Sequence, residues 1–157
     1  MTVEAVRAFL ALNAPDVEVV ELEASTATVE MAARGHGVMP AQIAKTLSLR
    51  IKDRALLIVT CGDARLNNRK IKDVLGGKPR MLGADEVVSL TGHPVGGVCP
   101  FGLATPLPVY CDVSLKTFDE VVPAAGSINS ALRIAPERMA ALVKAEWIDV
   151  CDRQVTP

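Results

Sequence analysis

One lysine of this 157-residue chain stands in an otherwise apolar row. Residues 43 to 51 (IAKTLSLRI) predict a strand, in which alternate side chains share a face. Lys45 then shares its face with Ile43, Leu47, Leu49 and Ile51. Because an ammonium group is costly to bury without a partner, two interpretations stay open. Lys45 is either a functional group on the floor of a cleft or a side chain near the strand end that reaches water.

The segment from Gly92 to Gly102 (GHPVGGVCPFG) combines four glycines with two prolines. Glycine lets a ligand approach the main chain, and proline stiffens the turn. A rigid loop with free N–H groups suits an oxyanion or a phosphate, and we expect Gly96 and Gly97 to supply such donors. The alternative is a structural turn. The segment is neither a Walker loop nor a dinucleotide fingerprint, because no GK[ST] follows it and it succeeds a predicted helix.

The same loop carries His93 and Cys99, a residue pair that could form a nucleophile. Their separation of six positions does not place the side chains together, so a thiol nucleophile is only a minor alternative. The spacing of the four cysteines and two histidines matches neither a disulfide framework nor a zinc site. We therefore expect reduced thiols, no metal and a cytoplasmic protein. The lack of a long apolar run or a signal-peptide pattern agrees with that location.

Charge is unevenly distributed along a chain whose formal net charge is −1. Residues 65 to 80 hold six basic residues against Asp73, and residues 1 to 30 hold six acidic residues against Arg7. The basic stretch is a candidate landing site for a phosphate backbone, and two solvated faces are the alternative. The low overall charge argues against a protein that coats nucleic acid. One Trp, one Tyr and three Phe are too few for a stacking platform for single strands.

The predicted secondary structure mixes short helices with short strands. Helices are expected at the N-terminus, after Thr28, at residues 68–75 and 84–90, and from Pro136. Strands are expected at 17–22, 43–51, 55–61, 107–111, 120–124, 131–135 and 147–151, with a hairpin joining the second to the third. These elements predict an α+β fold: a single domain over residues 1–157 with a mixed, largely antiparallel twisted sheet flanked by short helices.

Three segments together resemble the YbaK/prolyl-tRNA editing-domain family: residues 25–50 (STATVEMAARGHGVMPAQIAKTLSLR), 92–102 and 123–134 (PAAGSINSALRI). The IAKTL and GGVxPFG stretches are the specific parts, and the resemblance extends over nearly the whole chain. That family comprises small cytosolic proteins, and domains of some prolyl-tRNA synthetases, that hydrolyse the ester of wrongly charged tRNA. The resemblance implies the family's α+β fold and the activity of a free-standing aminoacyl-tRNA deacylase.

The resemblance also implies roles for individual residues. Lys45 corresponds to the lysine needed for activity, and Gly96 and Pro100 belong to the loop that shapes the pocket. Members commonly carry Ser at the position of Cys99, which leaves the role of this thiol open. The substrate-binding candidates are Thr26, Thr46, His93, Val98, Cys99, Pro100, Phe101, Gly126 and Ser127. The tRNA-binding candidates are Arg65, Arg69, Lys70 and Lys72.

The implied substrate is aminoacyl-tRNA, with tRNA(Pro) carrying Ala, Cys, Ser or Thr as the first expectation and prolyl-tRNA synthetase as a second partner. A hydrophobic pocket separates small side chains by only about 1–3 kcal/mol per methylene, so a second, hydrolytic site is useful. We expect attack by water or by the substrate's own groups, such as a cysteinyl thiol that cyclises, without a covalent enzyme intermediate. No cofactor, DNA or membrane is expected. A non-catalytic module that binds tRNA or a synthetase is the alternative.

Overall fold

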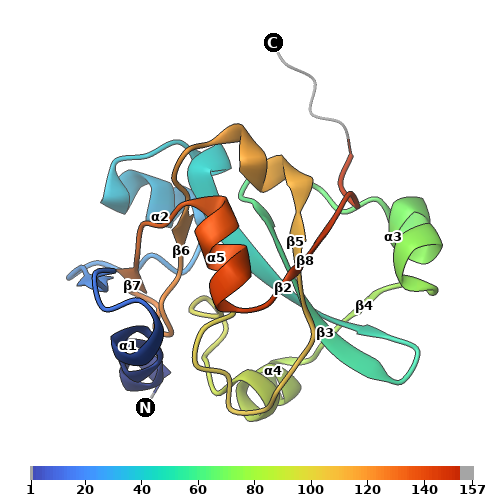
Figure 1. Cartoon of the computed structure of the whole chain (residues 1–157), viewed down its shortest axis with the longest axis horizontal. Helices are drawn as coiled ribbons and strands as arrows, with labels where there is room; N and C mark the ends of the chain where they lie inside the picture. Colours follow the sequence, from blue (N-terminus) through green and yellow to red (C-terminus); the bar gives the residue numbers. More distant parts are fainter. Residues whose placement is uncertain (1, 153–157) are drawn as a thin grey trace.

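A long hairpin forms the centre of the sheet in the computed structural model, which describes residues 2–152 (Figure 1). β2 (Ile43–Ile51) and β3 (Arg54–Cys61) pair antiparallel from Ala44↔Cys61 to Ile51↔Arg54. This register places even-numbered side chains of β2 on the same face as odd-numbered side chains of β3. The predicted hairpin is confirmed.

The other strands of this sheet add to both sides of the hairpin. β5 (Val109–Asp112) pairs parallel with β3, and β8 (Glu146–Ile148) pairs parallel with β5. On the other side of the hairpin, β4 (Arg80–Met81) pairs antiparallel with β2, and β6 (Val122–Pro123) pairs parallel with it. The sheet is mixed as predicted but less antiparallel than predicted. The reason is the long segment between β3 and β5, which provides the crossover that a parallel neighbour requires.

The helices flank this sheet (Figure 1). They are α1 (Thr2–Asn13), α2 (Val29–His36), α3 (Asn68–Leu75), α4 (Ala84–Thr91) and α5 (Pro136–Leu142), with 3-10 turns at Pro40–Gln42 and Val113–Thr117. Thr28 caps α2 as predicted, because its side chain accepts a hydrogen bond from the Met31 N–H at 3.2 Å. Within the described residues, none of the helices has the length and hydropathy needed to span a bilayer.

Two buried cores lie on the two faces of the hairpin. The larger core packs Leu57 and Val59 of β3 with residues of α1, α5 and the glycine-rich loop, including Phe101. The second core packs Leu49 and Ile58 with Ile71 of α3. A small separate sheet pairs β1 (Val20–Glu21) antiparallel with β7 (Ser130–Ala131), so the strands predicted at 17–22 and 131–135 are shorter than expected.

Candidate functional site

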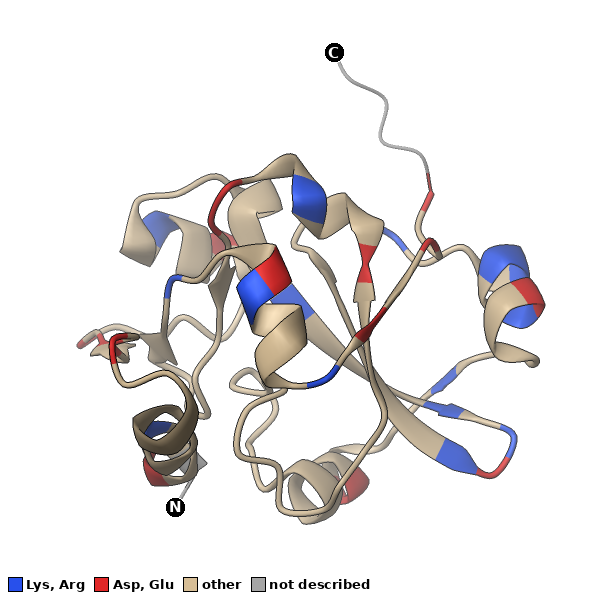
Figure 2. Ribbon diagram, in the orientation of Figure 1, with Lys and Arg blue, Asp and Glu red and all other residues tan. Residues whose placement is uncertain are grey.

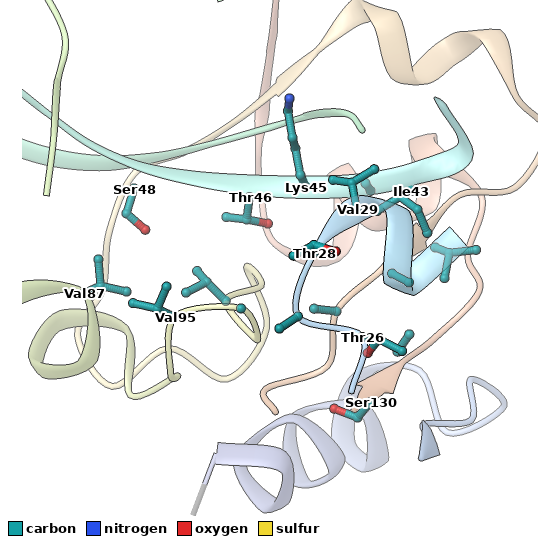
Figure 3. Close-up of a pocket in the computed structure, with 18 of the residues that line it drawn as sticks. Thr26, Thr28, Val29, Ile43, Lys45, Thr46, Ser48, Val87, Val95 and Ser130 are labelled. Carbon is teal, nitrogen blue, oxygen red and sulfur yellow. The ribbon is translucent and has the colours of Figure 1, made fainter. Parts of the chain in front are cut away.

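A cavity of about 390 Å³ opens beside strand β2 (Figure 3). Its walls come from β2, the segment that leads into α2, the start of α4 and the loop that follows α4. Figure 3 shows Thr46 and Ser48 pointing from β2 toward the side of Val87 and Val95. Thr26 and Ser130 line the cavity from a third side. Valines and hydroxyl groups therefore surround the same space.

The cavity lies where the edge of β2 is open. β6 pairs with Ile43 and Ala44, and β4 pairs with Leu49 and Arg50, so residues 45–47 have a strand neighbour only on the β3 side. The Leu82 N–H donates to the Ser48 carbonyl oxygen at 3.0 Å on the open side. Main-chain groups alternate between the two edges of a strand, so Thr46, two residues earlier, directs its N–H and C=O to that same side.

The Thr46 hydroxyl is the unsatisfied group of this floor. Its Oγ1 atom is buried and has no hydrogen-bond partner among the residues that the structure describes. A buried polar group without a partner costs about 1–3 kcal/mol. Ser48, only 5% exposed, lies on the same face of the strand. The floor therefore contains a hydroxyl whose hydrogen-bonding capacity the described protein leaves unused.

Only the first half of the glycine-rich loop borders the cavity, through Val95, Gly96 and Val98. A Cβ on Gly96, whose φ is 92°, would lie 2.9 Å from the Ala27 Cβ, which explains why glycine stands there. The Gly97 N–H already donates to the Pro94 carbonyl at 2.9 Å, so it is not the free donor that the sequence predicted. The amides of Gly96 and Val98 make no hydrogen bond within residues 2–152 and stay available.

The second half of the loop is buried in the larger core rather than lining the cavity. Cys99, Pro100 and Phe101 are buried, and so is His93. The His93 Nε2 atom lies 2.7 Å from the Phe101 carbonyl oxygen and 3.6 Å from the Cys99 Sγ atom. The two side chains thus meet despite their separation in sequence, because the loop folds back on itself. These four residues were predicted to bind substrate, but none of them borders the cavity.

The Cys99 environment disfavours a thiolate nucleophile. Burial raises the pKa of Cys99 to about 12, although a hydrogen bond to the Phe101 carbonyl acts in the opposite direction. Burial lowers the pKa of His93 and so favours the neutral imidazole, although the hydrogen bond with Phe101 acts in the opposite direction. A neutral His93 and a protonated Cys99 hold the loop and offer no reactive group to the cavity.

The turn at residues 126–130 packs against the glycine-rich loop at Gly97. The Gly126 N–H donates to the Gly97 carbonyl at 3.0 Å, and a Cβ on Gly97 would lie 2.7 Å from the Ser127 main chain. The Ser127 Oγ atom lies 2.6 Å from the Ser130 Oγ atom. Gly126 and Ser127, both predicted to bind substrate, do not border the cavity, whereas Ser130 does.

The Lys45 ammonium lies on the other face of β2. Although the residue borders the cavity, its Nζ donates to the Ala64 carbonyl at 2.6 Å, and Figure 3 shows the side chain pointing away from Thr46 and Ser48. Burial lowers the pKa of Lys45, while the neighbouring Cys151 and Asp63 act in the opposite direction. The structure therefore does not bring this charge and the glycine-rich loop into one cavity.

The comparisons with known proteins agree with this architecture. A profile described as the aminoacyl-tRNA editing domain matches residues 23–142. The Bacillus subtilis (strain 168) protein YwhH, which is uncharacterized, is 46% identical over 153 residues, or 96% of this chain and 98% of that protein. The chain belongs to the aminoacyl-tRNA editing domain family. Every residue that lines the cavity falls within the matched part of this editing domain.

More distant relatives place the editing domain in two contexts. The proline–tRNA ligase of Citrifermentans bemidjiense is 34% identical over 107 residues, which are 68% of this chain and 19% of the ligase. A solved structure described as a candidate trans-editing enzyme for prolyl-tRNA synthetase has a TM-score of 0.90 at 35% identity, with 97% of this chain and 98% of that one covered. The hypothetical protein APE2540 has a TM-score of 0.87 at 30% identity, with coverages of 94% and 99%. The predicted family and fold class are confirmed.

The predicted tRNA-binding residues of the editing domain lie away from the cavity, on α3 and the segment before it. Arg65, Arg69 and Lys72 are exposed. The Lys70 ammonium is held by Asp149 Oδ1 at 3.1 Å and by the Cys151 carbonyl at 2.8 Å. None of the four borders the cavity.

Sequence reasoning missed Ser48 and Val95 as cavity residues. Ser48 had a signal, because strand alternation places it on the face of Thr46. Val95 had none beyond its place in the glycine-rich loop. Among the described residues, no group of three His, Cys, Asp or Glu side chains could hold a metal ion.

Proposed function

We propose that this editing domain acts in trans as a hydrolase of mischarged aminoacyl-tRNA, cleaving the ester of tRNA(Pro) that carries a small amino acid of the Ala, Cys, Ser or Thr class. The observation that carries the proposal is the cavity itself. One space is bordered by Thr46, whose hydroxyl has no partner, and by Gly96 and Val98, whose N–H groups make no hydrogen bond within residues 2–152. Its volume of about 390 Å³ is at the small end of ligand pockets and suits a small aminoacyl group with part of its ribose.

Ester hydrolysis needs donors aimed at the oxyanion that forms on the carbonyl. The Gly96 and Val98 amides are the candidates, and glycine at position 96 keeps this wall close to the main chain of Ala27. Gly97 contributes instead through its turn with Pro94 and its contact with the Ser127 main chain. We assign the Thr46 hydroxyl to the substrate or to the attacking water, since it has no partner within the described protein.

The nucleophile is proposed to be water, or a group of the substrate such as a cysteinyl thiol that cyclises. A serine or threonine nucleophile needs a neighbouring base. The described residues that line the cavity include no His, Asp or Glu, and the Cys99 thiol is fully buried elsewhere. Attack of water on the carbonyl carbon breaks its bond to the ribose oxygen. With water, the products are the free amino acid and the tRNA 3′ end. With the cysteinyl thiol, a carbon–sulfur bond replaces the bond to the ribose oxygen, which takes up the thiol proton, and the products are the cyclic thioester of cysteine and the tRNA 3′ end. Neither route has a covalent enzyme intermediate.

For Lys45 we propose a positioning role. Its hydrogen bond to the Ala64 carbonyl ties β2 to the turn after β3, and Thr46 is the next residue of the strand. The charge of Lys45 thereby fixes the strand that presents the Thr46 hydroxyl. The family resemblance implies that Lys45 is needed for activity. A positioning role explains how this residue can be needed although its ammonium group lies outside the cavity.

The test is a deacylation panel. tRNA(Pro) carrying Ala, Cys, Ser, Thr or Pro is incubated with the wild-type protein and with Thr46→Val. We expect one or more of the small non-cognate esters to be cleaved faster than its spontaneous hydrolysis, and Pro-tRNA(Pro) to be spared. Tight binding of tRNA with no acceleration for any ester would support the non-catalytic binding module instead.

A further inference from the structure

A second hollow of about 500 Å³ lies at the turn end of the β2–β3 hairpin. It is lined by Arg50, Lys52, Lys78, Pro79 and Arg80, and we call it the basic groove. Four of these five residues are cationic, and they come from two separate segments of the chain. Figure 2 shows blue segments gathered on the hairpin end and on β4. The sequence indicated only the second of these segments, because Arg50 and Lys52 lie outside the basic stretch 65–80.

The positive charges of the basic groove are only partly compensated within the protein. Arg50 and Arg80 are directly opposed in the β2–β4 pairing, an arrangement of like charges that is destabilising. Arg50 is bound by Glu86 at 2.7 Å. Lys52, Lys78 and Arg80 are exposed and make no ion pair with any residue between 2 and 152. The acids placed beside the groove are Asp53, in the hairpin turn next to Lys52, and Glu86, which pairs with Arg50, so its four cations outnumber them.

The basic groove and the cavity are lined by neighbouring residues of β2 and of the segment at β4. Arg80 lines the groove, while the next two residues, Met81 and Leu82, line the cavity. Arg50 of the groove is two positions from Ser48 of the cavity, a distance of about 7 Å along a strand. A chain with regularly spaced anions can therefore occupy the groove while its end enters the cavity.

We propose that the basic groove binds backbone phosphates of the tRNA strand whose aminoacylated 3′ end occupies the cavity, an inference that rests on the proposed function. Lysine and arginine are donors without acceptor capacity, and the groove contains no aromatic side chain on which a base could stack. Its contacts are thus to phosphates and carry no base sequence. The α3 surface is the competing site, but it does not border the cavity, and Lys70 is already engaged by Asp149.

The experiment compares two double variants that each remove two positive charges. Lys52→Asn with Lys78→Gln alters the groove, and asparagine tolerates the Lys52 φ of 55°. Arg69→Gln with Lys72→Gln is the matched control on α3. Each protein is assayed on mischarged tRNA(Pro) and on the same aminoacyl ester of adenosine, which has no phosphates. Thermal unfolding verifies that all variants fold.

The groove variant is expected to lose about tenfold in kcat/KM on tRNA while its rate on the adenosine ester stays within twofold. The dependence of log(kcat/KM) on log salt should become shallower by about 0.7–0.9 for each phosphate that the variant no longer neutralises. The control pair should stay within twofold on both substrates. An equal loss from both pairs, a larger loss from the α3 pair, or no loss from the groove pair would overturn the proposal.

Binding of uncharged tRNA(Pro), followed by fluorescence anisotropy, separates this inference from the proposed function. If the wild type cleaves neither ester, the hydrolase proposal fails, but a tenfold weaker binding confined to the groove variant would still support the groove. Binding that the groove variant leaves unchanged would overturn the groove, whatever the result of the hydrolysis assays.

Discussion

The two faces of strand β2 are surrounded in different ways. On one face, Thr46 and Ser48 border a cavity, and the Thr46 hydroxyl has no partner in the described protein. On the other face, the Lys45 ammonium donates to the Ala64 carbonyl at 2.6 Å. The Lys45 charge is therefore satisfied within the protein, whereas the Thr46 hydroxyl is not. Two other buried polar atoms, His36 Nε2 and His93 Nδ1, also lack a partner among the described residues, and neither residue borders the cavity. A missing hydrogen-bond partner thus distinguishes the two faces of β2 but does not by itself locate the site.

The largest expected effect comes from adding a side chain at Gly96, which borders the cavity. Gly96→Val should lower deacylation about a hundredfold or more, because its side chain meets Ala27 and occupies the space beside β2. Initial rates on mischarged tRNA measure this loss. Gly76→Val is the matched control, since its φ of 86° imposes similar strain with nothing within 4 Å. Equal activity losses in both variants would mean that strain, and not occupation of the cavity, is responsible.

The second prediction concerns the free hydroxyl of the cavity face. Thr46→Val should reduce kcat/KM by about 10- to 100-fold while leaving the free energy of unfolding unchanged or higher by about 1 kcal/mol, because an unpartnered buried hydroxyl is removed. Thr60→Val is the control, since the Thr60 Oγ1 donates to the Cys61 carbonyl at 3.0 Å. That variant should lose stability and keep its activity. An unchanged rate for Thr46→Val would remove Thr46 from the site.

The third prediction tests the opposite face of β2. Lys45→Met should lower kcat about tenfold with little change in KM, because the strand loses its bond to Ala64 but the tRNA contacts remain. Lys45→Arg should recover part of the loss by restoring a donor. Steady-state kinetics at two salt concentrations separate the possibilities. A loss confined to KM that depends on salt would show that the ammonium contacts tRNA phosphates instead.

The fourth prediction concerns His93, the buried side chain whose ring holds the glycine-rich loop through the Phe101 carbonyl. Burial lowers the pKa of His93 below its ordinary 6.5, so the unfolded chain binds this proton more readily than the folded one. The contribution of neutral His93 to the free energy of unfolding is therefore fully present above pH 6.5. It is lost as the pH falls below that value, by at most about 1.4 kcal/mol per pH unit. Urea unfolding from pH 7.5 to 5 measures the slope. His93→Gln should flatten it more than His36→Gln, whose shift has the same direction.

The smallest effect is expected at Cys99. Cys99→Ser should keep deacylation within about twofold, and iodoacetamide at pH 8 should not inactivate the wild type, because burial raises the pKa of the Cys99 thiol to about 12. Loss of all activity in Cys99→Ser with an unchanged fold would support the thiol hydrolase and contradict the assignment of the cavity.

Much of the framework was predictable from local signals. The β2–β3 hairpin followed from alternation around Asp53, the cap of α2 from Thr28, and α3 from the glycines that end it. The parallel neighbours of β3 were not predictable, since pairing between distant segments depends on tertiary packing. The sequence also could not predict that the two halves of the glycine-rich loop have different surroundings. Only the folded chain places Cys99 in the larger core and Gly96 at the cavity.

The most direct test of the central claim is the rate at which mischarged tRNA(Pro) loses its amino acid, with wild type, Thr46→Val and Thr60→Val compared at equal concentration. The account predicts cleavage of a small non-cognate ester well above the spontaneous rate by the wild type and Thr60→Val, and a loss of about tenfold or more in Thr46→Val. Wild-type rates equal to spontaneous hydrolysis for every ester, or full activity in Thr46→Val, would contradict it.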